Sequence, residues 1–163
     1  MADDLATIRK VIAAHHAVRR DVKSVGDSVS DLEALFSLQQ SQSGWAQGSI
    51  ETLSKKREQL MQTIRLLGDG LKNHFAQEEK LLPPLFGEGL MKALLLEHRD
   101  IRKKLEEAEA MLTSTTLEGL SQEELLYKKA RFQQMISNTC QMVEEHAGHE
   151  ELILRMLERG LAA

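Results

Sequence analysis

The stretch HFAQEEKLLPPL, residues 74–85, contains both the inward face of a helix and the point at which that helix ends. His74 and Glu78 lie one helical turn apart, so their side chains project from the same face. Pro83 and Pro84 end the helix, because a proline lacks the backbone N–H and its ring clashes with the preceding turn. The stretch therefore predicts a helix with a histidine and a carboxylate on one face and a sharp end.

Breaks in the hydrophobic pattern divide the rest of the chain into three more helices. The polar stretch 37–49 contains two glycines and is predicted to be a loop. Ser121 and Glu124 have the three-residue spacing of a capping box, which marks the start of a helix. The four predicted helices run from about residue 3 into the high thirties, from about 50 to 82, from about 88 to 112, and from about 121 to 159.

The composition is that of a helical globular domain. The 163 residues are 42% hydrophobic and 28% charged, enough to bury a core, and we treat residues 1–163 as one domain. Aromatic residues make up only 4%, and the abundant Leu, Glu, Lys, Gln and Met favour helices over sheets. Four long amphipathic helices predict an all-α, up-down-up-down antiparallel four-helix bundle.

Charge and cysteine content exclude several classes of protein. The 21 basic and 25 acidic residues give a net charge of −4, which offers no patch for nucleic acid or an anionic membrane. No apolar run approaches the roughly 18 residues of a membrane span. Cys140 is the only cysteine, which excludes an internal disulfide and a cysteine-based zinc or iron–sulfur site. We therefore expect a soluble protein in the reducing cytoplasm, with no nucleic-acid or membrane partner.

Ionisable residues interrupt the apolar stripe of every predicted helix. They are His15, His74, Glu78, His98, His146 and Glu150. If roughly a third of helix positions face inward, one inward histidine on each of four helices arises by chance about once in a hundred. In an up-down bundle the four imidazoles also lie at similar heights, roughly 12 to 20 Å from the same end of the molecule. We therefore expect the six side chains to meet in one layer of the core.

A buried cluster of this kind requires a cation. An ionised carboxylate in a core costs several kcal/mol unless a positive charge neutralises it, and no Lys or Arg shares the stripe nearby. The alternative is that Glu78 and Glu150 are protonated or reach water at the bundle end. Imidazoles and carboxylates suit iron, manganese or zinc, and six ligands exceed the four of a structural zinc site. Two metals bridged by the carboxylates use the set more fully.

Three segments carry a family resemblance: HFAQEEKLLPPL (74–85), LLLEHRDI (94–101) and HAGHEELIL (146–154). They resemble the hemerythrin-like, or HHE, cation-binding domain, and the four-helix pattern extends the resemblance over nearly the whole chain. The resemblance implies a centre of two non-haem iron ions, with zinc or manganese as substitutes, bridged by the two glutamates. The ligands that it implies are His15, His74, Glu78, His98, His146 and Glu150.

Two positions depart from the oxygen-carrying hemerythrins. Those proteins have an additional histidine four residues before the one that matches His98, where this chain has Leu94. They also place the last carboxylate five residues after its histidine, which would select Glu151 in place of Glu150. We favour Glu150, because a spacing of four residues from His146 keeps it closer to the stripe.

The remaining residues around the expected centre have open roles. His16 and His149 lie at stripe edges and are expected to be solvated or to take part in helix packing, with a supporting or substitute-ligand role as the alternative. Segment 102–110 is expected to be an exposed face with pairs of opposite charge. Four flanking carboxylates either orient the ligand imidazoles or only form the wet face. They are Glu79, Glu97, Glu145 and Glu151.

Three classes of function fit such a centre. The first, which we favour, is a binding protein that responds to O₂, NO or redox state or handles iron, with a separate protein partner for its output. The second is an enzyme that oxidises ferrous iron or acts on peroxide or NO at an open metal position. The third is a helical module in which the metal is structural. The expected partners are metal ions and a small diatomic molecule or peroxide.

With two imidazoles per metal, His15 with His74 and His98 with His146, we expect a nearly symmetric centre.

Overall fold

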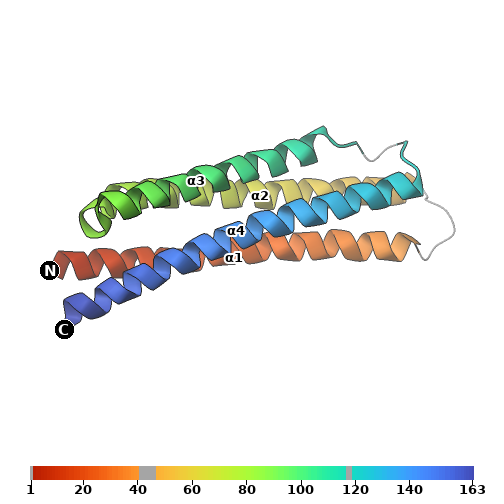
Figure 1. Cartoon of the computed structure of the whole chain (residues 1–163). Helices are drawn as coiled ribbons and strands as arrows, with labels where there is room; N and C mark the ends of the chain where they lie inside the picture. The colour runs from red at the N-terminus through yellow and green to blue at the C-terminus, as the bar shows by residue number, and fades with distance from the viewer. Residues whose placement is uncertain (1, 41–46, 117–118) are drawn as a thin grey trace.

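Four long helices run antiparallel to one another in the computed structural model, which describes residues 2–40, 47–116 and 119–163 (Figure 1). They are α1 (Ala2–Gln40), α2 (Gln47–Leu81), α3 (Pro83–Ser114) and α4 (Gln122–Ala162). Both α1 and α3 pack against α2 and α4, and the two chain ends lie beside the turn between α2 and α3 (Figure 1). The predicted all-α, up-down-up-down bundle is confirmed, and these ranges contain no strand.

The connection between α1 and α2 is shorter than predicted. The first helix continues to Gln40 and the second begins at Gln47, so the loop predicted over 37–49 was too long. Only residues 41–46, in the middle of that prediction, lie outside the described residues. Serine and glutamine reduce helix propensity only slightly, so a polar composition does not by itself end a helix.

The proline pair ends α2 as predicted, but it also begins α3. Pro83 and Pro84 occupy the first two positions of α3, where a missing backbone N–H costs no intrahelical hydrogen bond. The regular helix is then interrupted at Gly87, whose φ of 73° and ψ of 177° lie outside the helical region. Glycine tolerates this positive φ because it has no Cβ. The predicted start of the third helix at Glu88 was therefore wrong. The helix begins at Pro83, and Glu88 is the first residue after its kink at Gly87.

The fourth helix begins with the predicted capping box. The Ser121 side chain accepts a hydrogen bond from the backbone N–H of Glu124 at 3.2 Å, and the Glu124 carboxylate accepts one from the Ser121 N–H at 2.9 Å. The helix continues through Gly160 to Ala162, slightly beyond the predicted end. A single glycine in a helix costs only about 1 kcal/mol relative to alanine, so it need not end one.

Two apolar clusters leave a polar layer between them. Apolar side chains lie mainly on the inward faces, and no helix of the described ranges is apolar over enough of its length to cross a bilayer. Along α1, Val11 belongs to one cluster and Val18 to the other, with the buried His15 between them. The cluster that contains Val11 is formed by Ile8, Val11, Leu82, Phe86, Met91, Leu94 and Leu154. The polar layer is thus enclosed by apolar packing on both sides.

Candidate metal centre

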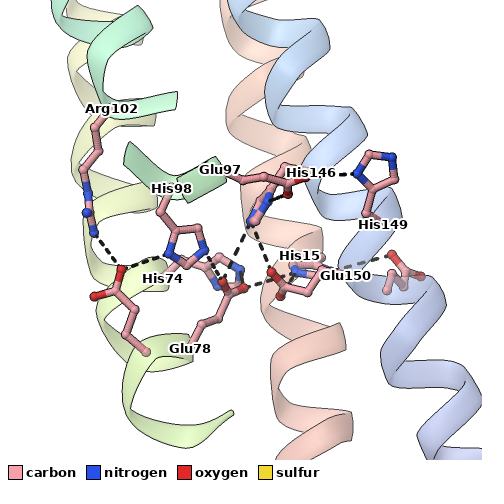
Figure 2. A network of polar contacts seen from close by, with 11 residues as sticks. His15, His74, Glu78, Glu97, His98, Arg102, His146, His149 and Glu150 are labelled. Carbon is pink, nitrogen blue, oxygen red and sulfur yellow. Dashed lines mark hydrogen bonds and ion pairs between the residues drawn. The ribbon is translucent and has the colours of Figure 1, made fainter. Parts of the chain in front are cut away.

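The six predicted ligands come together in this polar layer (Figure 2). None of the six is more than 7% exposed. A spacing of four residues lets α2 and α4 each direct a histidine and a glutamate toward the same point. The contributions are His15 from α1, His74 and Glu78 from α2, His98 from α3, and His146 and Glu150 from α4. The structure therefore assembles the whole predicted set, and the role of these residues as ligands stays a prediction.

The carboxylate of Glu78 faces imidazoles on both sides of the layer. Its Oε2 lies 2.9 Å from Nε2 of His98. Its Oε1 lies 3.5 Å from Nε2 of His15 and also contacts Nε2 of His74. One oxygen is thus directed to the imidazoles from α1 and α2, and the other to the imidazole from α3. This is the arrangement that a carboxylate needs to bridge two cations.

The two carboxylate oxygens of Glu150 also face opposite sides of the layer. Its Oε1 lies 3.1 Å from Nε2 of His15, and its Oε2 lies 3.2 Å from Nε2 of His146. The ligand atoms form two overlapping sets, and within each set they lie within 4.8 Å of one another. The sets are His15, His74, Glu78 and Glu150, and Glu78, His98, His146 and Glu150. Both contain two imidazoles and the same two carboxylates.

Buried polar atoms without hydrogen bonds mark the same layer. In the part of the chain that the structure describes, such atoms are almost confined to it, although buried polar atoms are normally satisfied. Imidazole nitrogens and carboxylate oxygens are suitable ligands for first-row divalent metals. The unsatisfied atoms of the layer are His15 Nδ1, His74 Nε2, Glu78 Oε1, His146 Nε2 and Glu150 Oε2. The residues present therefore fit a pair of cations.

Opposite charges in the layer shift the pKa values of His15 and Glu78. Burial by itself lowers the pKa of His15, but hydrogen bonds and charges of Glu150 and Glu78 raise it to about 9. Burial by itself raises the pKa of Glu78, but the facing imidazoles of His15, His74 and His98 hold it well below its usual range. In the metal-free protein His15 therefore keeps its proton between Glu78 and Glu150, and a cation that binds to His15 must displace that proton.

Comparison with known families identifies the domain. A family model described as the hemerythrin HHE cation-binding domain matches residues 6–157, which include all six predicted ligands. The chain belongs to the hemerythrin HHE cation-binding family. No curated protein and no solved structure matches it significantly. The HHE match and the two buried His and Glu sets together identify a cation-binding domain.

Two carboxylates outside the layer hold imidazoles of this HHE domain. Nδ1 of His98 donates to Glu79 at 2.9 Å, and Nδ1 of His146 donates to Glu97 at 2.5 Å. Burial by itself raises the pKa of Glu97, but its bond to His146 lowers it below the usual range. Such partners fix the ring orientation and make the opposite nitrogen a stronger ligand. Of the two alternatives for Glu79 and Glu97, the orienting contact is the one observed.

Glu151 and Glu145 lie outside the centre. Glu151 accepts hydrogen bonds from Arg19 at 2.6 Å and from Arg155 at 2.7 Å. Burial alone raises the pKa of Glu151, but these two guanidinium groups lower it to about 2. Glu145 is exposed and accepts a hydrogen bond from Gln141 at 2.9 Å. The hydrogen bonds of both carboxylates are thus made outside the layer, and the Glu151 oxygen nearest to Nδ1 of His15 lies 3.7 Å from it.

The two remaining histidines of the HHE domain are exposed, as predicted. His16 follows His15 directly and faces solvent, because a helix turns by about 100° per residue. The side chain of His149 is 67% exposed, and its Nδ1 donates to Glu97 at 3.3 Å. His149 therefore contacts the carboxylate that holds a predicted ligand, without entering the layer itself (Figure 2).

Phe75 and Arg102 are structural partners of the centre that sequence reasoning missed. The buried Phe75 ring stacks on His98 at a centroid distance of 3.8 Å and an interplanar angle of 11°. Arg102, which we assigned only to an exposed face, donates to Glu79 at 3.2 Å and lies 5.4 Å from the Phe75 ring centre. Two features of the sequence could have indicated these residues. Phe75 lies next to His74, and Arg102 lies one helical turn after His98.

Substituting the two adjacent histidines of α1 tests the helical phase of the site. His15→Ala should cause a loss of bound metal, because His15 lies in the layer, whereas His16→Ala should leave the metal content unchanged. Elemental analysis of both variants after identical loading measures the difference. Equal losses, or a greater loss in His16→Ala, would contradict the assignment of His15.

Proposed function

We propose that this HHE domain holds two iron ions in its two overlapping ligand sets, and that it binds or responds to O₂, NO or redox state. The observation that carries this proposal is the orientation of the two carboxylates. In Glu78 and in Glu150, one oxygen faces His15, and the other faces an imidazole of α3 or α4. Iron suits imidazole and carboxylate ligands, changes oxidation state and binds diatomic molecules. The single cysteine further supports a reducing, cytoplasmic setting.

Metal content tests the proposal directly. Protein loaded with iron should contain two iron ions per chain, because the two sets share both carboxylates and each has two imidazoles of its own. Elemental analysis together with protein quantification gives this ratio. One iron per chain, with all six residues still required, would instead indicate a mononuclear site. Zinc in a preparation grown without added iron would not decide between metals, because such sites accept zinc readily.

Leu94 bears on whether the proposed centre carries oxygen reversibly. It is buried, lies one turn before His98, and belongs to the apolar cluster beside the layer. It excludes water there but supplies no ligand, so neither metal receives a third imidazole from this position. We expect the reduced protein to be oxidised by O₂ and to stay oxidised when O₂ is removed. Visible absorption after anaerobic reduction, exposure to air and argon sparging tests this, and return of the colourless reduced form would indicate a carrier.

A surface pocket favours the enzyme as the second candidate function. The pocket has a volume of about 120 Å³, and Glu97, Ile101, Met142 and His146 contribute to its lining. A small molecule in it would contact the outer side of the His146 ring. Catalytic consumption of peroxide or NO by the reduced protein, beyond one equivalent per centre, would favour an enzyme. A single stoichiometric reaction would favour the binding protein.

A further inference from the structure

The two sets of candidate ligands are equal in kind but differ in their surroundings. We call the set that uses His15 and His74 the α1/α2 position, and the set that uses His98 and His146 the α3/α4 position. Each position has two imidazoles, and both share the same two carboxylates. The types of ligand therefore do not distinguish the two positions, whereas the groups that hold these ligands do.

Both imidazoles of the α3/α4 position are held by carboxylates. Glu79 accepts from Nδ1 of His98 at 2.9 Å, and Glu97 accepts from Nδ1 of His146 at 2.5 Å. A proton fixed on Nδ1 leaves the lone pair on Nε2, the nitrogen that faces the shared glutamates. Both imidazoles are thus set in the tautomer and orientation that bind a metal.

Aromatic packing adds to the rigidity of the α3/α4 position. Phe75 stacks face to face on His98, and the His146 ring meets it edge-on at 5.5 Å with an interplanar angle of 85°. Arg102 lies over the same phenyl ring and donates to Glu79. The contact of Phe75 with the neighbouring His74 is looser, at 6.3 Å and a tilt of 48°. The phenyl ring therefore restrains the imidazoles of one position more than those of the other.

The α1/α2 position lacks comparable support. Nδ1 of His15 is buried without a hydrogen bond, and the nearest Glu151 oxygen lies 3.7 Å away. Arg19 and Arg155 already neutralise that carboxylate, which weakens it as an acceptor. Among the hydrogen bonds of the described residues, none joins a carboxylate to Nδ1 of His74. The predicted near-symmetry therefore holds for the ligands and fails for their surroundings.

We propose that the two positions bind metal in order: the α3/α4 position fills first and retains its ion, and the α1/α2 position fills second and exchanges its ion. This inference rests on the proposed two-metal function. Outer carboxylate partners of ligating histidines typically change metal affinity by about 10–100-fold, and we expect a difference of that size here. The exchangeable ion is then the one held by α1 and α2.

Zinc titration of a matched pair of variants tests this order, with a competing chromophoric chelator to measure affinity. Repulsion between two cations would produce two binding steps even in a symmetric site, so the wild type alone does not decide. His15→Ala should keep one zinc ion with the affinity of the first wild-type step. His98→Ala should bind its first zinc ion about 10–100-fold more weakly than His15→Ala binds its zinc ion. Equal affinities in the two variants, or the reverse order, would overturn the inference.

A second pair of variants keeps all six candidate ligands. Glu97→Gln should weaken the first zinc step and leave the second unchanged. Glu145→Gln should change neither step, because the hydrogen bond of that neighbouring carboxylate goes to Gln141 and not to a candidate ligand. Circular dichroism verifies that each variant is folded. An effect of Glu97→Gln on the second step alone, or on neither step, would overturn the inference while two bound metals still support the proposed function. A wild type that binds fewer than two zinc ions would overturn both.

Discussion

Glu150→Gln is expected to remove both metals from the protein, whereas Glu151→Gln is expected to leave the metal content unchanged. Glu150 is buried and belongs to both ligand sets. Replacing its carboxylate by an amide would therefore remove a negatively charged ligand from both metal positions. The loss of affinity should exceed the roughly 100-fold that removal of an outer partner can cause. Iron and zinc content after gel filtration, together with affinity from chelator competition, measures the effect.

Glu151→Gln is the matched control for this prediction. Glu151 is the next residue on α4, but its carboxylate is held by Arg19 and Arg155 on the surface. Its substitution should cost only the exposed ion pairs, which typically contribute about 0–1 kcal/mol to stability. Retention of both metals by Glu150→Gln together with their loss from Glu151→Gln would show that the spacing of five residues applies, as in the oxygen carriers.

Removal of metal is expected to lower the melting temperature by about 10–20 °C. Ligands that bind only the folded state stabilise it by about 2.7 kcal/mol each at a free concentration 100 times Kd. For a domain of this size, 1 kcal/mol corresponds to about 2–4 °C. Melting followed by circular dichroism, with the iron-loaded protein compared with protein treated with chelator, measures the shift.

The metal-free protein should nevertheless remain helical at room temperature. Apolar clusters lie on both sides of the layer, and the larger one extends from Val18 and Leu71 to Leu32 and Leu125 without contribution from the candidate ligands. Loss of the helical circular dichroism signal after treatment with chelator would favour the structural module, in which the metal is required for folding. An unchanged melting temperature would contradict metal binding in this layer.

Local sequence features determined the four helices and the composition of the site. The apolar stripes, the proline pair and the capping box of Ser121 and Glu124 act within a few residues, so the sequence contains their whole cause. The same periodicity separates His15 from His16, because adjacent helical residues differ by about 100° in direction. Six ionisable residues on four inward faces were therefore recognisable before any helix was placed against another.

Only the tertiary structure decided how these residues are paired and supported. The bonds of Glu79 to His98 and of Glu97 to His146 join residues 19 and 49 positions apart. Whether a half-buried carboxylate such as Glu79 or Glu97 reaches such a ring depends on the rotation and separation of two packed helices, which the periodicity of either helix does not determine. Phe75 is a similar case, because burial follows from the stripe but stacking on His98 requires the position of α3. The difference between the two metal positions arises from these interhelical contacts, since the ligands themselves are the same in kind.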